Sequence, residues 1–508
     1  MTSAGNLLVH GRRIPADQLT PVLAYRRLVA PDRRQDPSFL LESVEQGGAV
    51  GRHSMVGARP VVQVTARGQH VEVTRGDRVE RFTHANPMQV PRGISGHWRP
   101  IHSGSVPPAF HGGWVGHVGF DAVRWLEPVA LAFERAPRDD RGLPDMHLGL
   151  YRSVAVFDHA RQVVDLVASE PLQDHASETS ARQAADAAID AMVHLMLGRA
   201  EPLPTGELRL DAAAPPDRPI SGTSGQAGFE AAVREAIEAI RAGDAFQIVL
   251  SQRLERQTRV DPFEIYRALR IVNPSPYQVY LQAPGCILVA SSPEIACRVR
   301  GRTVTNRPLA GTRPRGATPQ ADADLAAQLL ADPKERAEHA MLVDLGRNDL
   351  GRVCRAGSVQ VERCMDVERY SHVMHLSSTL TGTLAEGMDA WDALQATLPV
   401  GTVSGAPKIR AIQIIDRLEP VRRGPYAGAI GVAGFDGDMD MAIALRTMVV
   451  PTSGGAAPPW TVHLQAGAGV VLDSDPASEF RETLHKAAAL GRAIDLAEQA
   501  FASGHPRA

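Results

Sequence analysis

Two pairs of glutamates, each pair separated by three positions, are the residues in this sequence whose type and spacing most clearly suggest a chemical function. They are Glu335 and Glu338 in DPKERAEH, and Glu479 and Glu482 in SDPASEFRETLHK. Side chains at positions i and i+3 project from one face of a helix. Four carboxylates from two such helices would suit Mg²⁺, which prefers oxygen ligands and often bridges to an anionic substrate. An isolated Glu-x-x-Glu pair on a helix is usually a solvated face, so the interpretation depends on the neighbouring motifs.

A glycine-rich apolar segment lies just before the second glutamate pair. Gly467, Ala468 and Gly469 interrupt LQAGAGVV, where glycine lets another group approach the backbone closely. Exposed backbone N–H groups there would bind a carboxylate without adding a side-chain charge; the alternative is a β-bulge or tight strand packing. Arg446, in the strand-like IALRTMVV, and Lys486 could supply fixed positive charge, or could be ordinary surface cations.

Two histidines in YSHVMHLSS, His372 and His375, leave three interpretations open. Two imidazoles at this spacing can share a zinc ion, although no pattern of further ligands accompanies them. A histidine in an apolar segment can also be a hydrogen-bonded core residue. Beside a bound substrate, a neutral histidine can act as acid or base, because its reference pKa lies near working pH.

The elements that must position these residues fall into two parts separated by a linker. The segment from Glu201 to Gly225 is rich in Pro, Gly and small polar residues, which cannot sustain a helix or a central strand. Helical spacing predicts an amphipathic helix on each side of it, and AFQIVL after the second helix predicts a buried strand. The apolar positions that define the two helices are Ala185, Ile189, Met192, Leu195 or Met196, and then Phe229, Val233, Ile237 and Ile240.

Composition excludes several classes of protein. With 54 Lys and Arg against 57 Asp and Glu, the net charge of −3 provides no broad basic surface for nucleic acid or anionic lipid. No apolar run is long enough to span a membrane, and the N-terminus lacks a secretory signal. The four cysteines show no CxxC spacing, so we expect reduced thiols in a cytoplasmic protein.

Longer segments resemble the chorismate-utilising enzyme family. They cover about half of the chain in the order typical of the family: RPLAGTRPRG, DPKERAEHAMLVDLGRNDLGRV, YSHVMHL, PVGTVSGAPKIRA, RRGPYAGAIG and QAGAGVVLDSDPASEFRETLHKA. The N-terminal part is similar to the anthranilate synthase large subunits of this family, through TPVLAYRRL, LLES, GRHSMVG and LPDMHLGLYRSVAVFDH. The activity implied is conversion of chorismate and ammonia to anthranilate and pyruvate, the first step of tryptophan biosynthesis.

The resemblance implies a role for individual residues. The metal ligands would be Glu335, Glu338, Glu479 and Glu482, surrounding Mg²⁺. Glu294, in SSPE, would protonate the hydroxyl that leaves C4, and His375 would assist the later loss of pyruvate. The residues that would hold the two carboxylates of chorismate are Gly311, Thr312, Thr402, Tyr426, Arg446, Gly467, Ala468, Gly469 and Lys486.

Two positions distinguish branches of the family. Isochorismate and salicylate synthases carry a lysine base where this sequence has Gln247, and aminodeoxychorismate synthases often carry a lysine nucleophile where it has Ala310. Glutamine cannot act as the base at the first position, and alanine cannot act as the nucleophile at the second. An external ammonia would therefore be the nucleophile. The alternatives that remain are an aminodeoxychorismate synthase without its usual lysine, and a catalytically inactive tryptophan-binding regulator.

The resemblance also implies partners and a second site. No cysteine lies in a Gly-x-Cys-x-Gly motif, so a separate glutamine amidotransferase subunit would supply ammonia, in a heterotetramer of two large and two small subunits. A site for the inhibitor L-tryptophan would combine Glu42 and Ser43 of LLES with Pro276, Tyr277 and Gln278, the last where methionine is common. Without the resemblance, LLES would be interpreted as a helix at the edge of the core and NPSPY as a turn.

The expected fold is α+β, a large two-part sandwich of packed, mainly antiparallel β-sheets with helices outside. Residues 1–210 would form a regulatory and structural part that contributes to the tryptophan site. Residues 226–500 would form the chorismate-binding catalytic domain.

Overall fold

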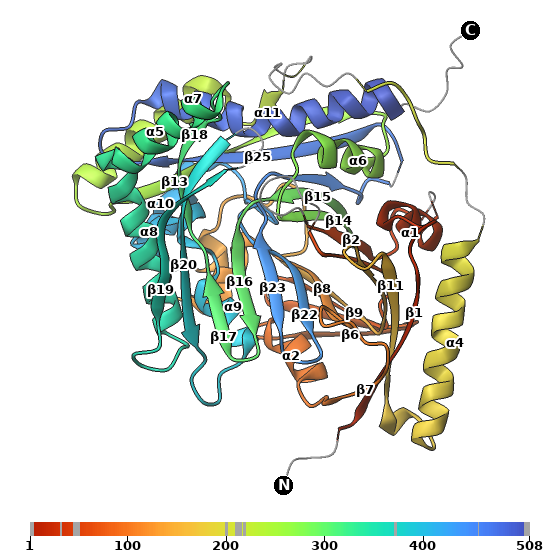
Figure 1. Cartoon of the computed structure of the whole chain (residues 1–508). Helices are drawn as coiled ribbons and strands as arrows, with labels where there is room; N and C mark the ends of the chain where they lie inside the picture. Colours follow the sequence, from red (N-terminus) through yellow and green to blue (C-terminus); the bar gives the residue numbers. More distant parts are fainter. Residues whose placement is uncertain are drawn as a thin grey trace.

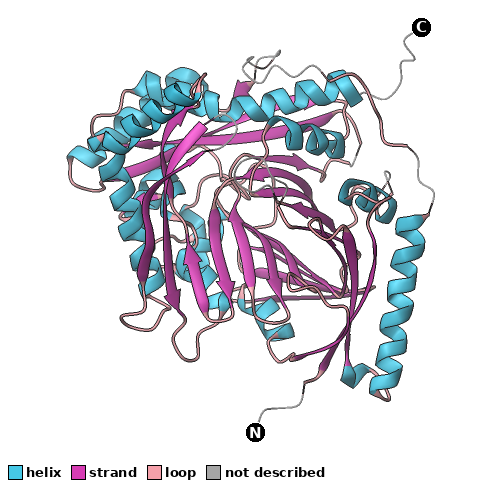
Figure 2. Ribbon diagram, viewed as in Figure 1, coloured by secondary structure: helices cyan, strands magenta, loops and turns pink. Residues whose placement is uncertain are grey.

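Two large β-sheets form the centre of the computed structural model, and most helices lie on their outer sides (Figures 1 and 2). The structure describes residues 5–30, 33–43, 51–198, 202–208, 216, 220–369, 373–455 and 457–501. Helices and extensive antiparallel sheets in one chain confirm the α+β class expected from the sequence.

The first sheet has thirteen strands among the described residues. In spatial order they are β12 (Ser221–Gly222), β13 (Gln247–Thr258), β25 (Trp460–Val470), β24 (Thr447–Pro451), β15 (Cys286–Ser292), β14 (Tyr277–Ala283), β2 (Ser38–Glu42), β3 (His53–Ala58), β10 (Ser153–Asp158), β11 (Val163–Pro171), β1 (Leu7–Pro15) and β7 (Pro100–Gly104), with β21 (Gly405–Ala406) also paired to β13. Only β1 and β7 pair in parallel within this described sheet.

The second sheet has twelve strands within the same described ranges. In spatial order they are β18 (Leu309–Pro314), β20 (Val373–Thr383), β17 (Thr303–Asn306), β16 (Ile295–Arg300), β23 (Met439–Ile443), β22 (Ala429–Gly434), β8 (Gly113–Val118), β9 (Met146–Tyr151), β4 (Val62–Arg67), β5 (His70–Arg75) and β6 (Arg78–Thr83), with β19 (Gln360–Arg369) also paired to β20.

Both sheets run through both parts of the chain. In the first sheet β2 pairs with β14, and in the second β8 pairs with β22. The two-residue strand β12 lies inside the expected linker, and part of that linker falls outside the described residues. The boundary between the parts 1–210 and 226–500 therefore stays a prediction, but each part completes the sheets of the other.

The helices have the bounds that follow. They are α1 (Pro21–Leu28), α2 (Gln89–Ser95), α3 (Val123–Leu126), α4 (Glu178–Leu197), α5 (Gly225–Arg241), α6 (Pro262–Val272), α7 (Pro319–Ala331), α8 (Pro333–Gly351), α9 (Ala390–Thr397), α10 (Lys408–Leu418) and α11 (Pro476–Phe501), with 3₁₀ turns η1 (Phe120–Ala122), η2 (Phe133–Arg135), η3 (Leu172–Asp174) and η4 (Gly401–Val403).

The two helices predicted on either side of the linker are α4 and α5. On α4 the buried residues Ala185, Ile189, Met192 and Met196 follow helical spacing, and Ser177 caps the first turn. On α5 the corresponding buried residues include Phe229, Val233 and Ile237. Both helices use their apolar face to cover the first sheet, as the periodicity indicated.

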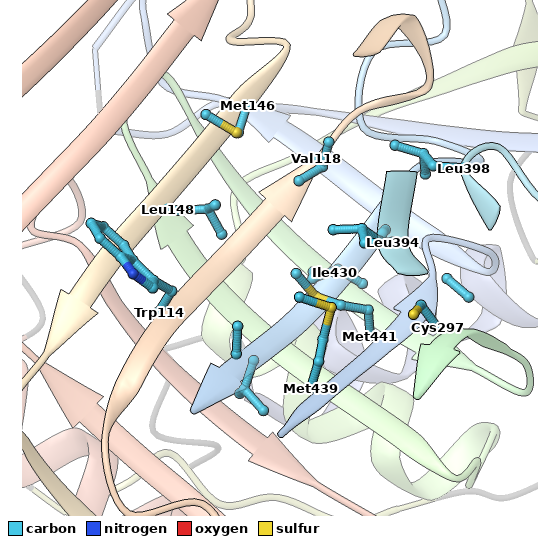
Figure 3. Close-up of a cluster of buried hydrophobic side chains, with 14 of the residues drawn as sticks. Trp114, Val118, Met146, Leu148, Cys297, Leu394, Leu398, Ile430, Met439 and Met441 are labelled. Carbon is cyan, nitrogen blue, oxygen red and sulfur yellow. The ribbon is translucent and has the colours of Figure 1, made fainter. Parts of the chain in front are cut away.

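The main hydrophobic core fills the space between the two sheets and extends to α9. Figure 3 shows its second-sheet side, where Trp114 of β8, Leu148 of β9, Met441 of β23 and Leu394 of α9 belong to one buried cluster. Burial of each such large apolar side chain stabilises the fold by about 1.5–3 kcal/mol. A second cluster packs α1, α4, α6 and α11 against the other face of the first sheet, so the sheet is covered on both faces.

All four cysteines are free thiols. Cys286, Cys297 and Cys354 are buried and Cys364 is exposed, so the described chain is held together without a disulfide bond. No described helix combines the length and the apolar character needed to cross a membrane.

Candidate active site

The two glutamate pairs lie on two helices, as predicted, and both are at the N-terminal ends of those helices. Glu335 and Glu338 are in the first two turns of α8, which starts where the Asp332 carboxylate accepts hydrogen bonds from the backbone N–H groups of Lys334 and Glu335. The other pair, Glu479 and Glu482, occupies the first two turns of α11. Carboxylates are favoured there because the helix N-terminus carries partial positive charge.

Electrostatic interaction connects the two pairs. Burial raises the pKa of Glu338, and Lys334 opposes this shift. The charges of the other three glutamates raise the pKa of Glu338 further, so all three lie within electrostatic reach of it. Burial and the charge of Glu482 also raise the pKa of Glu479, against a hydrogen bond from Ser474. A bound cation would relieve this repulsion.

Protein cations contact several of these carboxylates. Arg313 donates to Glu335 at 3.1 Å, and Nζ of Lys486 lies 2.6 Å from Glu482. Across the described ranges, no three His, Cys, Asp or Glu side chains converge closely enough to enclose an ion. The all-carboxylate donor set and its repulsion fit Mg²⁺ chemically, but ligation by all four glutamates would require these ion pairs to open.

Glu294 has the environment of a general acid. It lies between β15 and β16 and is only 4% exposed. Burial raises its pKa to about 8, although hydrogen bonds from Thr402 (3.0 Å) and from the backbone of Leu309 favour the carboxylate. At neutral pH this carboxyl group is therefore mostly protonated and has a proton to donate.

His375 is a neutral imidazole on β20. Its Nδ1 lies 3.0 Å from the carbonyl oxygen of Gly311 and 3.0 Å from the hydroxyl of Thr312. Burial lowers its pKa to about 4, and the positive charges of Arg446 and Lys486 contribute in the same direction. If Nδ1 donates to the Gly311 carbonyl, Nε2 of the neutral ring is the atom that can accept a proton.

The zinc interpretation depended on a second histidine, His372. That residue lies outside the described residues. His375 itself lies on strand β20, so the zinc interpretation stays a prediction.

The glycines of β25 allow a close approach to two other side chains. A Cβ atom on Gly467 would lie 2.9 Å from the carbonyl oxygen of Leu250 and 3.1 Å from the hydroxyl of Tyr426. A Cβ atom on Gly469 would lie 2.9 Å from Nε2 of Gln247. β25 pairs with β13 in unbroken register through these positions, so the bulge alternative is wrong. The predicted site residues Gly467, Ala468, Gly469 and Tyr426 thus meet at one place, beside the branch-determining Gln247.

Gly311 joins this group from the other side. Its φ of +69° is one that glycine adopts readily, and a Cβ atom there would lie 3.0 Å from a carboxylate oxygen of Glu335. Lys486 donates to the carbonyl oxygen of Gly467 at 2.9 Å. Since Lys486 also acts on the pKa of Glu294 and His375, the predicted catalytic, substrate and metal residues form one continuous group.

Arg446 differs from the sequence interpretation. The segment expected to be one strand is broken, and Arg446 lies between β23 and β24 with a φ of +46°. A side chain is strained in this conformation unless the surroundings hold it. The guanidinium donates to Oδ1 of Asn273 at 3.5 Å, and the backbone carbonyl accepts from Ser291 at 3.1 Å. The break takes Arg446 out of the ladder, and its positive charge lowers the pKa of His375.

Sequence reasoning missed a buried ion pair beneath the site. Arg423 donates to the carboxylate of Glu419 and to the carbonyl oxygens of Val403 and Val249, both at 2.7 Å. Glu419 in turn accepts from the backbone of Ser251 at 2.7 Å. The pair therefore fixes β13 and the turn that carries Thr402. Arg423 lies in the RRGPYAGAIG motif, but nothing in its spacing indicated this structural role.

The residues predicted for tryptophan line a cavity of about 140 Å³ between the two sheets. They are Glu42, Ser43, Pro276, Tyr277 and Gln278. Apolar walls come from Leu41, Met55, Phe110 and Ile430, and charged side chains of both signs from Arg298 and Asp440. A separate cavity of about 270 Å³ lies near Lys408 and Arg352, and the predicted catalytic residues line neither of the two.

The helix alternative for LLES is wrong. Leu40, Leu41 and Glu42 lie on strand β2, paired with β14, because the sheet continues through both parts of the chain. Tyr277, at the start of β14, donates to Asp440 at 2.6 Å and accepts from Arg298 at 2.7 Å. The two motifs thus meet across one pair of strands, which their separation in sequence hides.

Comparison with known proteins defines the class. The family model described as chorismate binding enzyme matches residues 36–492. The chain belongs to the chorismate-binding enzyme family, as its motifs predicted.

Within the family the similarity is to anthranilate synthases. The chain is 50% identical to anthranilate synthase alpha subunit 1, chloroplastic, of Oryza sativa subsp. indica, over 98% of this chain and 89% of that protein. It is 47% identical to anthranilate synthase component 1 of Streptomyces coelicolor, over 95% and 88% of the two chains. The crystal structure of anthranilate synthase component I from Streptococcus pneumoniae superposes with a TM-score of 0.73 at 35% identity, covering 95% of this chain and 99% of that one. These likenesses confirm the predicted relationship to the large subunits.

Proposed function

We propose that this chain is the chorismate-converting subunit of an anthranilate synthase, which forms anthranilate and pyruvate from chorismate and ammonia in tryptophan biosynthesis. The observation that carries the proposal is the pairing of a protonated buried acid, Glu294, with a neutral histidine, His375, in one group of residues. Ala310 and Gln247 add no internal amine, so ammonia enters as the nucleophile.

The first half of the reaction uses Glu294. Ammonia forms a bond to C2 of chorismate, and the C4–oxygen bond breaks as the double bonds shift. Glu294 gives its proton to the departing hydroxyl, which leaves as water. The product is an aminodeoxyisochorismate intermediate that still carries the enolpyruvyl group.

The second half uses His375. Nε2 removes the proton from C2, the bond between C3 and the enolpyruvyl oxygen breaks, and the ring becomes aromatic. The released enolpyruvate takes up a proton to become pyruvate. The hydrogen bond from Nδ1 to the Gly311 carbonyl keeps the ring oriented for this step.

The substrate-binding residues supply local positive charge and backbone donors. Arg446 and Lys486 suit the two carboxylates, and the glycines of β25 let the ring lie close to the backbone. Glu335, Glu338, Glu479 and Glu482 would hold Mg²⁺, which would neutralise a substrate carboxylate and the charge that develops on the ring. The chemistry would be that of an Mg²⁺-dependent lyase.

We further propose an amidotransferase partner and feedback regulation. The relatives are components or alpha subunits, which supports a glutamine amidotransferase subunit as ammonia source, in a two-plus-two heterotetramer. The 140 Å³ cavity has apolar walls and charged side chains of both signs. It therefore suits a zwitterionic amino acid with an apolar side chain, L-tryptophan. The free thiols are compatible with the cytoplasm.

Incubation of the purified chain with chorismate, Mg²⁺ and ammonium tests the proposed reaction. We expect fluorescent anthranilate together with an equal amount of pyruvate, measured by coupling to lactate dehydrogenase. An amino product without pyruvate would instead indicate an aminodeoxychorismate synthase. No conversion of chorismate, with tryptophan still bound, would indicate the inactive regulator.

Replacement of His375 should separate the two halves of the reaction. In His375→Ala we expect anthranilate formation to fall by about 100- to 10,000-fold, the range for loss of a general base. The amino intermediate should accumulate, which chromatography of quenched reactions would detect. His117→Ala is the matched control, because burial also lowers the pKa of His117 to about 4 but that residue lies on β8. An unchanged product ratio in His375→Ala would contradict the assignment.

A further inference from the structure

The hydroxyl of Ser291 is a fully used hydrogen-bonding centre beside the active site. Ser291 lies on β15, directly opposite Gln278 on β14, and both side chains are buried. The hydroxyl accepts from Nε2 of Gln278 at 3.2 Å and from Nδ2 of Asn273 at 3.0 Å, and it donates to the carbonyl oxygen of Asn273. A serine hydroxyl has one donor and two acceptor sites, so none remains for another partner.

Asn273 extends this network to the substrate-binding arginine. Its Oδ1 accepts from Nη1 of Arg446 at 3.5 Å, while the Ser291 backbone N–H binds the Arg446 carbonyl at 3.1 Å. Both contacts hold a residue whose backbone is in a strained conformation. The orientation of the Arg446 guanidinium therefore depends on Asn273 and Ser291.

At its other end, the network reaches Gln278, which lines the cavity of about 140 Å³ proposed for tryptophan, called the regulatory cavity from here on. Its two amide hydrogens are used, because Nε2 donates to the Asn273 carbonyl at 2.8 Å as well as to Ser291. Its Oε1 is buried and accepts no hydrogen bond from any described residue, and Gln278 lines the cavity. A buried acceptor without a partner costs about 1–3 kcal/mol, so an N–H donor in the cavity would bind it favourably.

A second connection runs from the cavity to the same asparagine. Glu42 accepts from the hydroxyl of Tyr266 at 2.6 Å and lies 2.6 Å from Nε of Arg270. Both partners belong to α6, and Asn273 caps the C-terminus of that helix. Two residues of the cavity are thus connected to Asn273. Glu42 is connected to it through α6, and Gln278 contacts it directly.

We propose that Gln278, Ser291 and Asn273 form a relay that couples occupancy of the regulatory cavity to the position of Arg446. An N–H group of the ligand binds Oε1 of Gln278 and draws the carboxamide into the cavity. Nε2 of Gln278 then no longer donates to the Ser291 hydroxyl or to the Asn273 carbonyl. As a result Asn273 releases Arg446, and the affinity for chorismate falls. Asn273 and Ser291 are positioning residues for Arg446. The relay rests on the proposed function, with L-tryptophan as the ligand.

Ser291→Ala tests the relay, because Ser291 does not line the cavity. Without tryptophan, we expect the KM for chorismate to rise severalfold while kcat stays within about twofold. Calorimetry should show tryptophan binding close to that of the wild type. The ratio of chorismate KM with and without saturating tryptophan, which for allosteric coupling is typically about 5–150, should fall towards one.

Ser169→Ala is the matched control, because Ser169 is equally buried, lies on β11 and its hydroxyl has no hydrogen-bond partner among the described residues. It should keep the wild-type ratio. A wild-type ratio in Ser291→Ala with tryptophan bound would overturn the relay. Failure of the wild-type chain to form anthranilate or to bind tryptophan would instead refute the proposed function, so the two failures are distinguishable.

Discussion

Glu294→Gln should reduce kcat/KM for anthranilate formation by about 100- to 10,000-fold, because the amide has the size of the acid but no proton to give to the leaving hydroxyl. Binding of chorismate should change little, since the side chain keeps its place beside Thr402. Steady-state fluorescence assays with ammonium as nitrogen source would measure the loss without any contribution from a partner subunit.

The pH dependence gives this prediction a second readout. The pKa of Glu294 is raised to about 8, so the acid is present below that pH and is lost as pH rises through it. His375 must be neutral to accept a proton. Because its pKa is lowered to about 4, this base is lost as the pH falls below that value. We expect a bell-shaped profile with limbs near these two values, and loss of the alkaline limb in Glu294→Gln. Thr402→Val should move that limb upward, because the hydrogen bond from Thr402 lowers the pKa of Glu294.

Asp145→Asn is the control for Glu294→Gln. Burial raises the pKa of Asp145 to about 6, but this residue accepts a hydrogen bond from Gly68 far from the site. Its replacement should leave the alkaline limb in place. A Glu294→Gln enzyme with near-normal turnover would exclude Glu294 as the acid.

Glu338→Ala should abolish turnover and the response to Mg²⁺. Loss of a partner that only supports a metal ligand costs about 10- to 100-fold in metal affinity or activity, and loss of a direct ligand should cost more. Removal of the metal with EDTA should stop the wild-type enzyme, and added Mg²⁺ should restore it. Calorimetric titration of Mg²⁺ in the presence of chorismate would measure binding independently of activity.

A second Glu-x-x-Glu pair provides the matched control for the metal prediction. Glu235 and Glu238 on α5 have the same spacing, and both are exposed to solvent and outside the buried face of the helix. Their replacement by alanine should leave both turnover and Mg²⁺ binding intact. Normal rates for Glu338→Ala at limiting Mg²⁺ would contradict the metal assignment.

Local patterns predicted the placement of the glutamate pairs well. The spacing of Glu335 and Glu338 predicted a shared helix face, because that property depends on a few consecutive residues. Their position at the start of α8 was not predicted. The burial of α4 followed from periodicity for the same reason. The α+β class itself came from the family resemblance.

Features that depend on distant pairing could not be found in this way. Glu294 looks like an ordinary turn residue, and its raised pKa arises only because two sheets and the Thr402 turn enclose it. The strand position of LLES depends on pairing with β14, more than two hundred residues later. The break at Arg446 is stabilised by Ser291 and Asn273, which no local pattern connects to it.

The pairing of early strands with late ones also governs how this chain can be made. β2, at residues 38–42, pairs early with β3 but cannot gain its second neighbour until β14 at residues 277–283 leaves the ribosome. Likewise β8, at residues 113–118, pairs early with β9 but gains its second neighbour only with β22 at residues 429–434. Until then both nascent sheets expose open edges, which are templates for association with other chains. Such non-local topology slows folding, so we expect these open edges to be exposed to other chains for most of the time the polypeptide is being made.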